Sequence, residues 1–376
     1  MNTSYFEACL RKYTDLIKVK KYKKVVEVLV NFMIEEPAEE IDPSCTPPAL
    51  PNVQCEDYTS VFGDDVTKAQ KEHKLGILIQ LGFDVDILEV YLYEVYDVID
   101  KFFITESVVS HSNLQTRKPL VWERLKDTPR FKRFADKVVH FVVDDAGRKI
   151  PDGDGWTSEY NQERLRWEKF KEWNEKHKFF ESDDLIGFGD TDEIPSRNAL
   201  AVLRQCSGSI DHADIGLTFF FGGHEDVFQS DFPIKRYPYT YGDPTFFTLK
   251  DALTYKEHKP YPNRLRGGSK KHILGGAHIS PYPYAPFIIN KAIVATEQST
   301  VRMIGGNMEE MEDFYKNEVV GSFKNRIKNV NEIMDQIKDH YYIPWIMKCV
   351  PGRYPSFFGK RDQRLYYPPC FFDFEC

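Results

Sequence analysis

Short apolar runs alternate with helix-like segments between about residues 75 and 195, and this alternation constrains the fold most strongly. Four runs are predicted to be strands: 76–81, 98–105, 138–143 and 185–189. The first of them suits a strand that is buried on both faces. Leu88, Leu92 and Val95 form one helical stripe after the first run, and a long charged helix is expected over 158–177. Strands that alternate with helices indicate an α/β fold with a mostly parallel central sheet.

The chain on either side of this region has a different composition. Residues 4–33 show helical spacing of apolar side chains, and 35–60 is acidic and rich in proline, which is typical of a linker. We therefore expect an N-terminal helix and linker over 1–70, standing apart from a main domain over 71–360, and a tail over 361–376. In the second half, 236–244 and 281–286 combine Tyr with Pro and favour irregular extended chain. A last helix is expected over 319–340.

Charge and cysteine content exclude several classes of protein. The 50 basic and 58 acidic residues give a net charge of −8, which argues against a general nucleic-acid-binding protein. No apolar run is long enough to span a membrane, and residues 1–11 lack the apolar stretch of a secretory signal, so a soluble or cytoplasmic protein is expected. The seven cysteines are odd in number and scattered. They predict neither a zinc site nor a full disulfide framework, and they favour a reducing compartment.

The segment most informative about function follows the fourth apolar run. Asp190, Thr191 and Asp192 stand where the expected strand ends, and Glu193 follows them. Ligands of open α/β sheets bind beyond the carboxyl ends of the strands. Two carboxylates there can share a hard cation such as Mg²⁺ or Mn²⁺, which would balance the charge of a departing diphosphate. The alternative is a solvated acidic turn, because short Asp-x-Asp patterns arise often by chance.

Other motifs are weaker or missing from the sequence. The segment 152–155 (DGDG) hints at a calcium loop but lacks the later ligands of an EF-hand, so a tight turn is favoured. The sequence contains no GxGxxG, Walker A, HExxH or GxSxG motif. A phosphotransferase that uses the same acidic pair would lack its phosphate-cradling glycine loop.

Several blocks, in order, resemble glycosyltransferase family 17, the β-1,4-mannosyl-glycoprotein 4-β-N-acetylglucosaminyltransferases. The matching blocks are Asp86–Val90 with Val98–Asp100, Glu106–Ser107, Ser110–Ser112, Lys118–Leu120, Trp156 with Glu159 and Gln162, Asp190–Pro195, Gly242–Thr245, Leu265–Arg266, Gly275–Ser280 and Asn290–Lys291. The resemblance covers about residues 75–360. It implies a GT-A-type nucleotide-sugar-binding fold, a UDP-sugar donor (UDP-GlcNAc), a glycan or glycoprotein acceptor, a divalent cation (Mn²⁺ or Mg²⁺) and inversion at the anomeric carbon. The absence of a membrane anchor gives no support to the Golgi-type lumenal location of family members.

Three positions depart from the family pattern. Tyr91 stands where the family usually has Arg, Glu163 interrupts a Gln–Arg pair, and Ala277 replaces a Trp. A lost Trp could remove a stacking surface, so these departures bear on the acceptor more than on the donor.

The resemblance and the residue chemistry together suggest roles for individual side chains. Asp190, Asp192 and His278 are expected at the metal. Glu106, His111, Lys118, Asp190 and Arg266 are expected to bind the donor. Asp192 and Glu193 are expected at the catalytic centre, with Asp226 and Asp243 as candidate bases for the acceptor hydroxyl. The alternatives are ordinary ones: a helix cap for Glu193, a structural role for His278, and exposed salt bridges for Lys118 and Arg266. A non-catalytic glycan-binding or scaffold protein on a degenerate transferase fold is the competing function.

Overall fold

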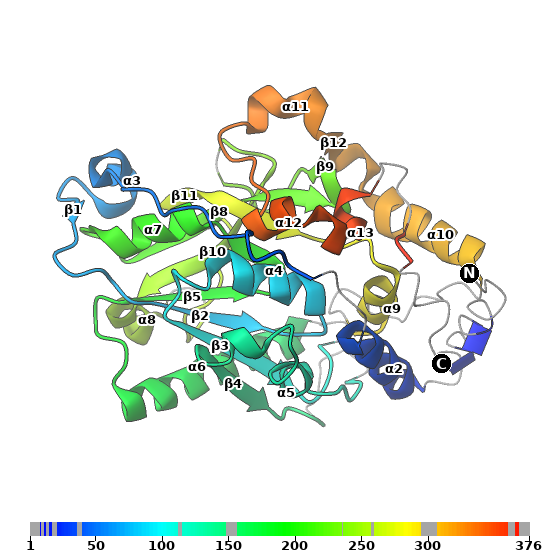
Figure 1. The fold of residues 1–376 in the computed structure, drawn as a ribbon. Helices are drawn as coiled ribbons and strands as arrows, with labels where there is room; N and C mark the ends of the chain where they lie inside the picture. Colours follow the sequence, from blue (N-terminus) through cyan, green and yellow to red (C-terminus); the bar gives the residue numbers. More distant parts are fainter. Residues whose placement is uncertain are drawn as a thin grey trace.

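The computed structural model places a large β-sheet between layers of helices (Figure 1). It describes residues 21–35, 40–111, 115–147, 156–234, 236–256, 259–294, 307–359 and 365–367, with isolated positions before residue 21. The DGDG segment at 152–155 lies outside the described residues, as does most of the tail over 361–376.

The main sheet has the strand order β12-β9-β8-β10-β5-β2-β3-β4, and β11 and β6 join it off this path. Its strands are β2 (Leu75–Gln80), β3 (Lys101–Ser107), β4 (Val138–Val143), β5 (Leu185–Asp190), β6 (Glu193–Pro195), β8 (His212–Phe221), β9 (Gly223–Phe228), β10 (Thr240–Thr248), β11 (His272–Ile279) and β12 (Ile327–Asn329). A separate antiparallel pair joins β1 (Thr67–Lys68) to β7 (Cys206–Ser207).

The helices lie on both faces of the sheet, with α4 on one face and α6 and α8 on the other (Figure 1). They are α2 (Tyr22–Glu35), α3 (Thr59–Phe62), α4 (Val85–Val95), α5 (Val121–Leu125), α6 (Trp156–His177), α7 (Arg197–Gln205), α8 (Leu249–Thr254), α9 (Ala285–Val294), α10 (Met308–Phe314), α11 (Val330–Ile337), α12 (Trp345–Cys349) and α13 (Pro355–Phe358). Short 3₁₀ turns occupy 55–58, 132–134, 321–326 and 351–353, and a π turn occupies 315–320.

The four expected strands are confirmed as β2, β3, β4 and β5, which are parallel neighbours. Alternate side chains of these strands enter separate cores. Ile77 and Ile79 of β2 pack on the α4 face, whereas Leu78 packs with Trp167 and Phe170 of α6. Because both faces are covered, β2 and β5 are buried along almost their whole length and are mostly apolar rather than alternating, as expected for a doubly covered sheet. The α/β class is therefore correct.

The expectation of a mostly parallel sheet is wrong, because the sheet is mixed. Strand β10 pairs antiparallel with both β5 and β8, and β9 pairs antiparallel with β8 and β12. The Tyr/Pro-rich stretch expected to be irregular contributes residues 240–244 to β10, where a register shift between Gly242 and Thr245 accommodates Pro244. The last helix is shorter than expected, because 327–329 forms β12 before α11 begins at Val330.

The segment before residue 75 packs on the main domain. Val25, Val26, Leu29 and Phe32 of α2 are buried in the same core as α4, and α2 lies beside α9 (Figure 1). Hydrophobic burial on this scale makes α2 part of the domain's core instead of a separate appendage.

Two disulfide bonds join the Pro-rich segment to distant parts of the chain. Cys45 is bonded to Cys349 of α12, and Cys55 is bonded to Cys206 of β7. The prediction that the cysteines form no disulfide framework is therefore wrong for these four. Disulfides persist mainly in oxidising compartments, so the cysteines no longer support a reducing one. In the described part of the chain, no helix is both long and apolar enough to cross a membrane.

Candidate active site

The segment from Asp190 to Glu193 forms a tight connection between β5 and β6 at the carboxyl end of β5. The Glu193 carboxylate accepts a hydrogen bond from the backbone N–H of Asp190 (2.8 Å), and Thr191 Oγ1 donates to the Gln80 carbonyl of β2 (3.0 Å). A Cβ at Gly189 would lie 3.0 Å from Pro244 and 3.2 Å from Glu193. The absence of a side chain at this position lets Glu193 fold back over the end of β5.

Strand β11 runs beside β6 and brings His278 to this connection. His278 is paired in register with Glu193, and Ala277 with Ile194. Gly276 has φ +138°, and a Cβ there would lie 2.4 Å from the Ile194 carbonyl oxygen, so glycine allows the two strands to approach. Ala277 is completely buried between β6 and β8. The Ala277 side chain therefore belongs to the hydrophobic core.

Asp192 faces His278, whose Nε2 lies 3.5 Å from Asp192 Oδ2. The imidazole packs against two aromatic rings, because its centroid is 4.3 Å from that of Tyr241 and 4.2 Å from that of Phe219. Burial alone would raise the pKa of Asp192, but His278 and Lys291 of α9 hold it well below its usual range. Asp192 is thus charged, and its side chain is 22 % exposed.

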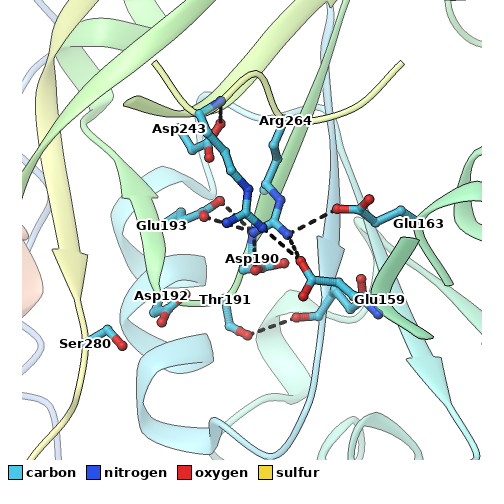
Figure 2. Close-up of polar contacts among 12 residues, drawn as sticks. Glu159, Glu163, Asp190, Thr191, Asp192, Glu193, Asp243, Arg264 and Ser280 are labelled. Carbon is cyan, nitrogen blue, oxygen red and sulfur yellow. Dashed lines mark hydrogen bonds and ion pairs between the residues drawn. The ribbon is translucent and has the colours of Figure 1, made fainter. Parts of the chain in front are cut away.

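Asp190 faces a different partner, Arg264, which lies at the centre of a group of acids (Figure 2). One terminal nitrogen of Arg264 contacts Asp190 and Glu193 (3.1 Å), and the other contacts Glu159 and Glu163 (3.1 Å). Burial alone would lower the pKa of Arg264, but these four carboxylates raise it well above its ordinary value. Arg264 is the shared counter-ion of the group.

The acids opposite Asp190 come from one face of α6. Glu159, Gln162, Glu163 and Arg166 follow the i, i+3, i+4, i+7 spacing of a helical stripe and are all buried. Arg166 donates to the carbonyls of Leu78 (3.2 Å) and Gly189 (3.1 Å), which fixes the helix over the ends of β2 and β5. The first half of α6 thus presents polar groups to the candidate site, and its second half presents Trp167 and Phe170 to the core.

The loop over 263–269 carries Arg264 and Arg266. Side chains of neighbouring strands hold it in place by accepting hydrogen bonds from its backbone N–H groups. Asp243 Oδ1 accepts from the N–H of Arg266 (3.2 Å), and Asp214 Oδ2 accepts from the N–H of Ser269 (3.0 Å). Thr245 Oγ1 accepts from the N–H of Leu265 (2.9 Å) and donates to Asp214 Oδ1 (2.6 Å). Burial raises the pKa of Asp243 well above its ordinary value. Asp243 is therefore placed to anchor the loop.

Arg266 and Glu106 have partners within the protein. Arg266 contacts Glu159 (3.0 Å) and lies over the rings of Trp156 and Phe232. Glu106 is completely buried and accepts from the N–H groups of Val121 (2.6 Å) and Trp122 (2.8 Å) at the start of α5. This geometry is that of a carboxylate that satisfies a helix N-terminus.

His111 and Lys118 lie near the end of β2. His111 Nε2 is 2.7 Å from Gln80 Nε2, and burial lowers the pKa of this imidazole. Gln80 also donates to Gln162 (2.8 Å). Lys118 Nζ donates to the Gly82 carbonyl (3.1 Å) and lies 3.5 Å from Glu106. These two residues border the same edge of the sheet as Asp190, one strand away.

Asp226 is the proposed site residue that the fold places far from the others. It lies on β9 opposite Asn329 of β12, and it is close enough to Tyr315 to help raise the pKa of that phenol. Strands β8 and β10 separate β9 from β5. Three inter-strand steps of about 4.8 Å put β9 roughly 14 Å from β5.

Asp84 is an acid of the site that the sequence interpretation missed. It precedes α4, and its Oδ2 lies within hydrogen-bond distance of Thr191 Oγ1 (3.1 Å). Burial and the charge of Asp192 raise its pKa to about 7. Burial also raises the pKa of Glu159 and of Glu193 to about 7, in spite of Arg264. The site therefore concentrates more negative charge than its protein cations fully offset.

Arg264 and the α6 stripe were also missed as site residues, although Glu159 and Gln162 carried part of the family resemblance. A signal for the stripe existed, because four polar residues recur at helical spacing between 159 and 166. Arg264 had no comparable signal. Arg264 becomes a site residue because the 263–269 loop packs against α6, about 100 residues earlier in the chain.

The chemistry of the site fits a hard cation. The partly exposed carboxylates of Asp190 and Asp192 could supply oxygen ligands. Mg²⁺ and Mn²⁺ bind proteins through one or two carboxylates together with substrate phosphates. The two aspartates have different protein partners, and no ready-made group of three or more ligands occurs within the described ranges. A cation here would therefore depend on phosphate oxygens or water for its remaining ligands.

Taken together, these features define an α/β protein whose candidate site lies at the carboxyl ends of parallel strands, where proteins of this class bind ligands. The chain belongs to glycosyltransferase family 17, whose sequence profile matches residues 46–228. The match begins in the Pro-rich segment and ends with β9, so it includes Asp190 and Asp192 but not Arg264 or His278. No curated protein matches the chain significantly. The family makes the protein a glycosyltransferase.

Proposed function

We propose that the protein transfers GlcNAc from UDP-GlcNAc to a glycan acceptor, with inversion at the anomeric carbon and with the help of Mn²⁺ or Mg²⁺. One observation carries the proposal. Asp190 and Asp192 stand at the carboxyl end of β5 with side chains 32 % and 22 % exposed, inside the region that matches the family. Acids at this position are accessible to a ligand, whereas Glu159, Glu163 and Glu193 around them are buried.

In this proposal, some residues of the site hold the cation, and the others position those residues or add charge beside them. Asp190 and Asp192 would hold the cation, which when bound supplies neutralisation of the departing diphosphate. Lys291 of α9 donates to Ser280 Oγ (3.0 Å) and adds positive charge on the side of Asp192. His278 orients Asp192 through the 3.5 Å contact. The other acids around Arg264 keep Asp190 in place.

Direct displacement with inversion needs a base that removes the proton of the acceptor hydroxyl. Asp243 is buried with a raised pKa and anchors the 263–269 loop, and Asp226 lies three strands from β5. Both oxygens of Glu193 are bound, one by Arg264 and the other by the Asp190 N–H. We therefore propose that Glu193 positions Asp190, and that neither Asp226 nor Asp243 is the base.

The test is metal-dependent hydrolysis of UDP-GlcNAc, accompanied by a thermal-shift screen of UDP-sugars with and without Mn²⁺. Asp192→Asn removes a charged ligand and should lower metal-dependent hydrolysis by more than about 100-fold. Asp183→Asn is the matched control, because Asp183 precedes the same strand, is 71 % exposed and lies 3.6 Å from Lys250. Wild-type hydrolysis by Asp192→Asn, or no stabilisation by any UDP-sugar, would refute the proposal.

A non-catalytic glycan-binding protein is the second candidate. The observation in its favour is that both aspartates already have protein partners, Arg264 and His278. This alternative expects binding of a glycan with no turnover at any concentration of Mn²⁺. The same hydrolysis assay distinguishes the two functions.

A further inference from the structure

Arg264 binds only one of the two carboxylate oxygens of Asp190. The contact is made by Asp190 Oδ2, and the other oxygen, Oδ1, has no hydrogen-bond partner within the described residues. The backbone N–H of the same residue is bound by Glu193, which also contacts Arg264. Asp190 is therefore fixed from two directions while one of its oxygens stays available.

Arg264 itself is fixed more firmly than a single ion pair would require. Glu159 and Glu163 of α6 bind its second terminal nitrogen. The backbone on its carboxyl side is anchored on β8 and β10 through Asp214, Asp243 and Thr245. A planar guanidinium can bridge two pairs of carboxylates in a way that a lysine ammonium cannot. Two separate parts of the fold thus converge to set the position of one guanidinium.

We propose that Arg264 is a positioning residue for the cation site, because it occupies Asp190 Oδ2 and so presents Asp190 Oδ1 to an incoming divalent cation. The inference rests on the proposed function for the presence of that cation. Hydrogen-bonded partners of metal-binding carboxylates commonly change metal affinity by about 10- to 100-fold when they are mutated. A merely structural arginine would change stability without a specific effect on metal affinity.

The experiment measures Mn²⁺ affinity from the electron paramagnetic resonance signal of free Mn²⁺, without nucleotide. Arg264→Lys keeps the charge but loses the bridging geometry, and its affinity should fall by about 10- to 100-fold. The matched control is Arg204→Lys, because Arg204 also contacts two acids, Glu72 (2.8 Å) and Asp100 (2.8 Å), but lies outside the site. Its Mn²⁺ affinity should stay within about two-fold of the wild type.

A second measurement separates positioning from direct contact with the nucleotide. UDP affinity without metal should be the same in Arg264→Lys and in the wild type. Equal Mn²⁺ affinities, or a loss of metal-free UDP binding, would overturn the inference. If Arg264→Lys does not fold, Glu163→Gln takes its place, because it loosens Arg264 without touching Asp190. It should lower Mn²⁺ affinity by about three-fold or more, and an unchanged value would again overturn the inference.

The failure of this inference can be told apart from failure of the proposed function. A wild-type protein that binds UDP-GlcNAc and Mn²⁺, with an unaffected Arg264→Lys variant, would remove only the role of Arg264. A wild-type protein that binds neither ligand would remove the proposed function, and the role of Arg264 with it.

Discussion

Asp214 should make the stability of the protein fall as the pH rises, and replacing it should remove this effect. The Asp214 carboxyl is completely buried on β8, and burial raises its pKa from 3.8 to about 7. The folded protein therefore binds a proton at a pH at which the unfolded chain has released it. When the native state binds more protons, the free energy of unfolding decreases as the pH rises. The stabilisation is full below pH 3.8 and is lost as the pH rises towards 7.

The magnitude follows from the two pKa values. A difference of about three pKa units corresponds to about 4 kcal/mol over the whole titration, and between pH 5 and pH 8 about 2.5 kcal/mol is lost. Asp214→Asn should abolish this part of the pH dependence. Asparagine can still accept from the Ser269 N–H and can donate to Thr245 Oγ1, which are two of the partners of the carboxyl group. The 263–269 loop should therefore remain anchored.

The assay is urea unfolding followed by tryptophan fluorescence at pH 5, 6, 7 and 8, with the disulfides intact and the ionic strength constant. The unfolding free energy of Asp214→Asn relative to wild type should rise by about 2.5 kcal/mol across this range. Asp231→Asn controls for the loss of one charge, because Asp231 is exposed and pairs with Arg326 at the surface. Parallel pH profiles for Asp214→Asn and wild type would refute the reasoning.

Two further predictions concern the framework of the site. Gly276→Ala should lower the unfolding free energy by about 2–4 kcal/mol, because its Cβ would lie 2.4 Å from the Ile194 carbonyl oxygen. Gly82→Ala, whose nearest contact would be 3.6 Å, is the control, and equal thermal midpoints for the two variants would contradict the geometry. The double variant Cys55→Ser/Cys206→Ser should lose about 2–5 kcal/mol in urea unfolding, because this disulfide closes a loop across 151 positions. A midpoint equal to that of the wild type would show that this bond does not constrain the unfolded chain.

The parallel half of the sheet could be predicted because each of its strands produces a recognisable pattern within a short stretch of sequence. The apolar runs at 76–81, 138–143 and 185–189 became β2, β4 and β5 within about a residue, and the long charged helix became α6. In each case, burial on both faces of the sheet or on one face of a helix requires a pattern that is visible in a short window. The position of Asp190 at the end of β5 followed from the same pattern.

The antiparallel half and the disulfides could not be predicted because they depend on contacts between distant segments. Nothing near Thr240 indicates that β10 lies between β5 and β8, since its Tyr and Pro residues favour irregular chain when considered alone. Cys45 and Cys349 are 304 positions apart, and their spacing has no periodic or motif character. The partner of a side chain such as Arg264 is likewise set by tertiary structure alone.

Two of the three departures from the family pattern meet in the group around Arg264. Tyr91, where the family usually has Arg, is completely buried near Glu193, and the charge of Glu193 helps to raise the pKa of its phenol. Glu163, where a Gln–Arg pair is interrupted, contacts Arg264 and also Lys259 (3.2 Å).

Against the pattern that the resemblance implies, Tyr91 places a neutral side chain near Glu193. Glu163 places a carboxylate beside Arg264, and the arginine of the pair is displaced by one position to Arg164. Both changes make the surroundings of Asp190 more acidic. Because buried carboxylates repel one another in a medium of low dielectric constant, a more acidic site has more to gain from a bound cation. The departures therefore strengthen the demand for positive charge at Asp190 in this chain, and Arg264 meets only part of that demand, since the pKa values of Glu159 and Glu193 stay raised beside it.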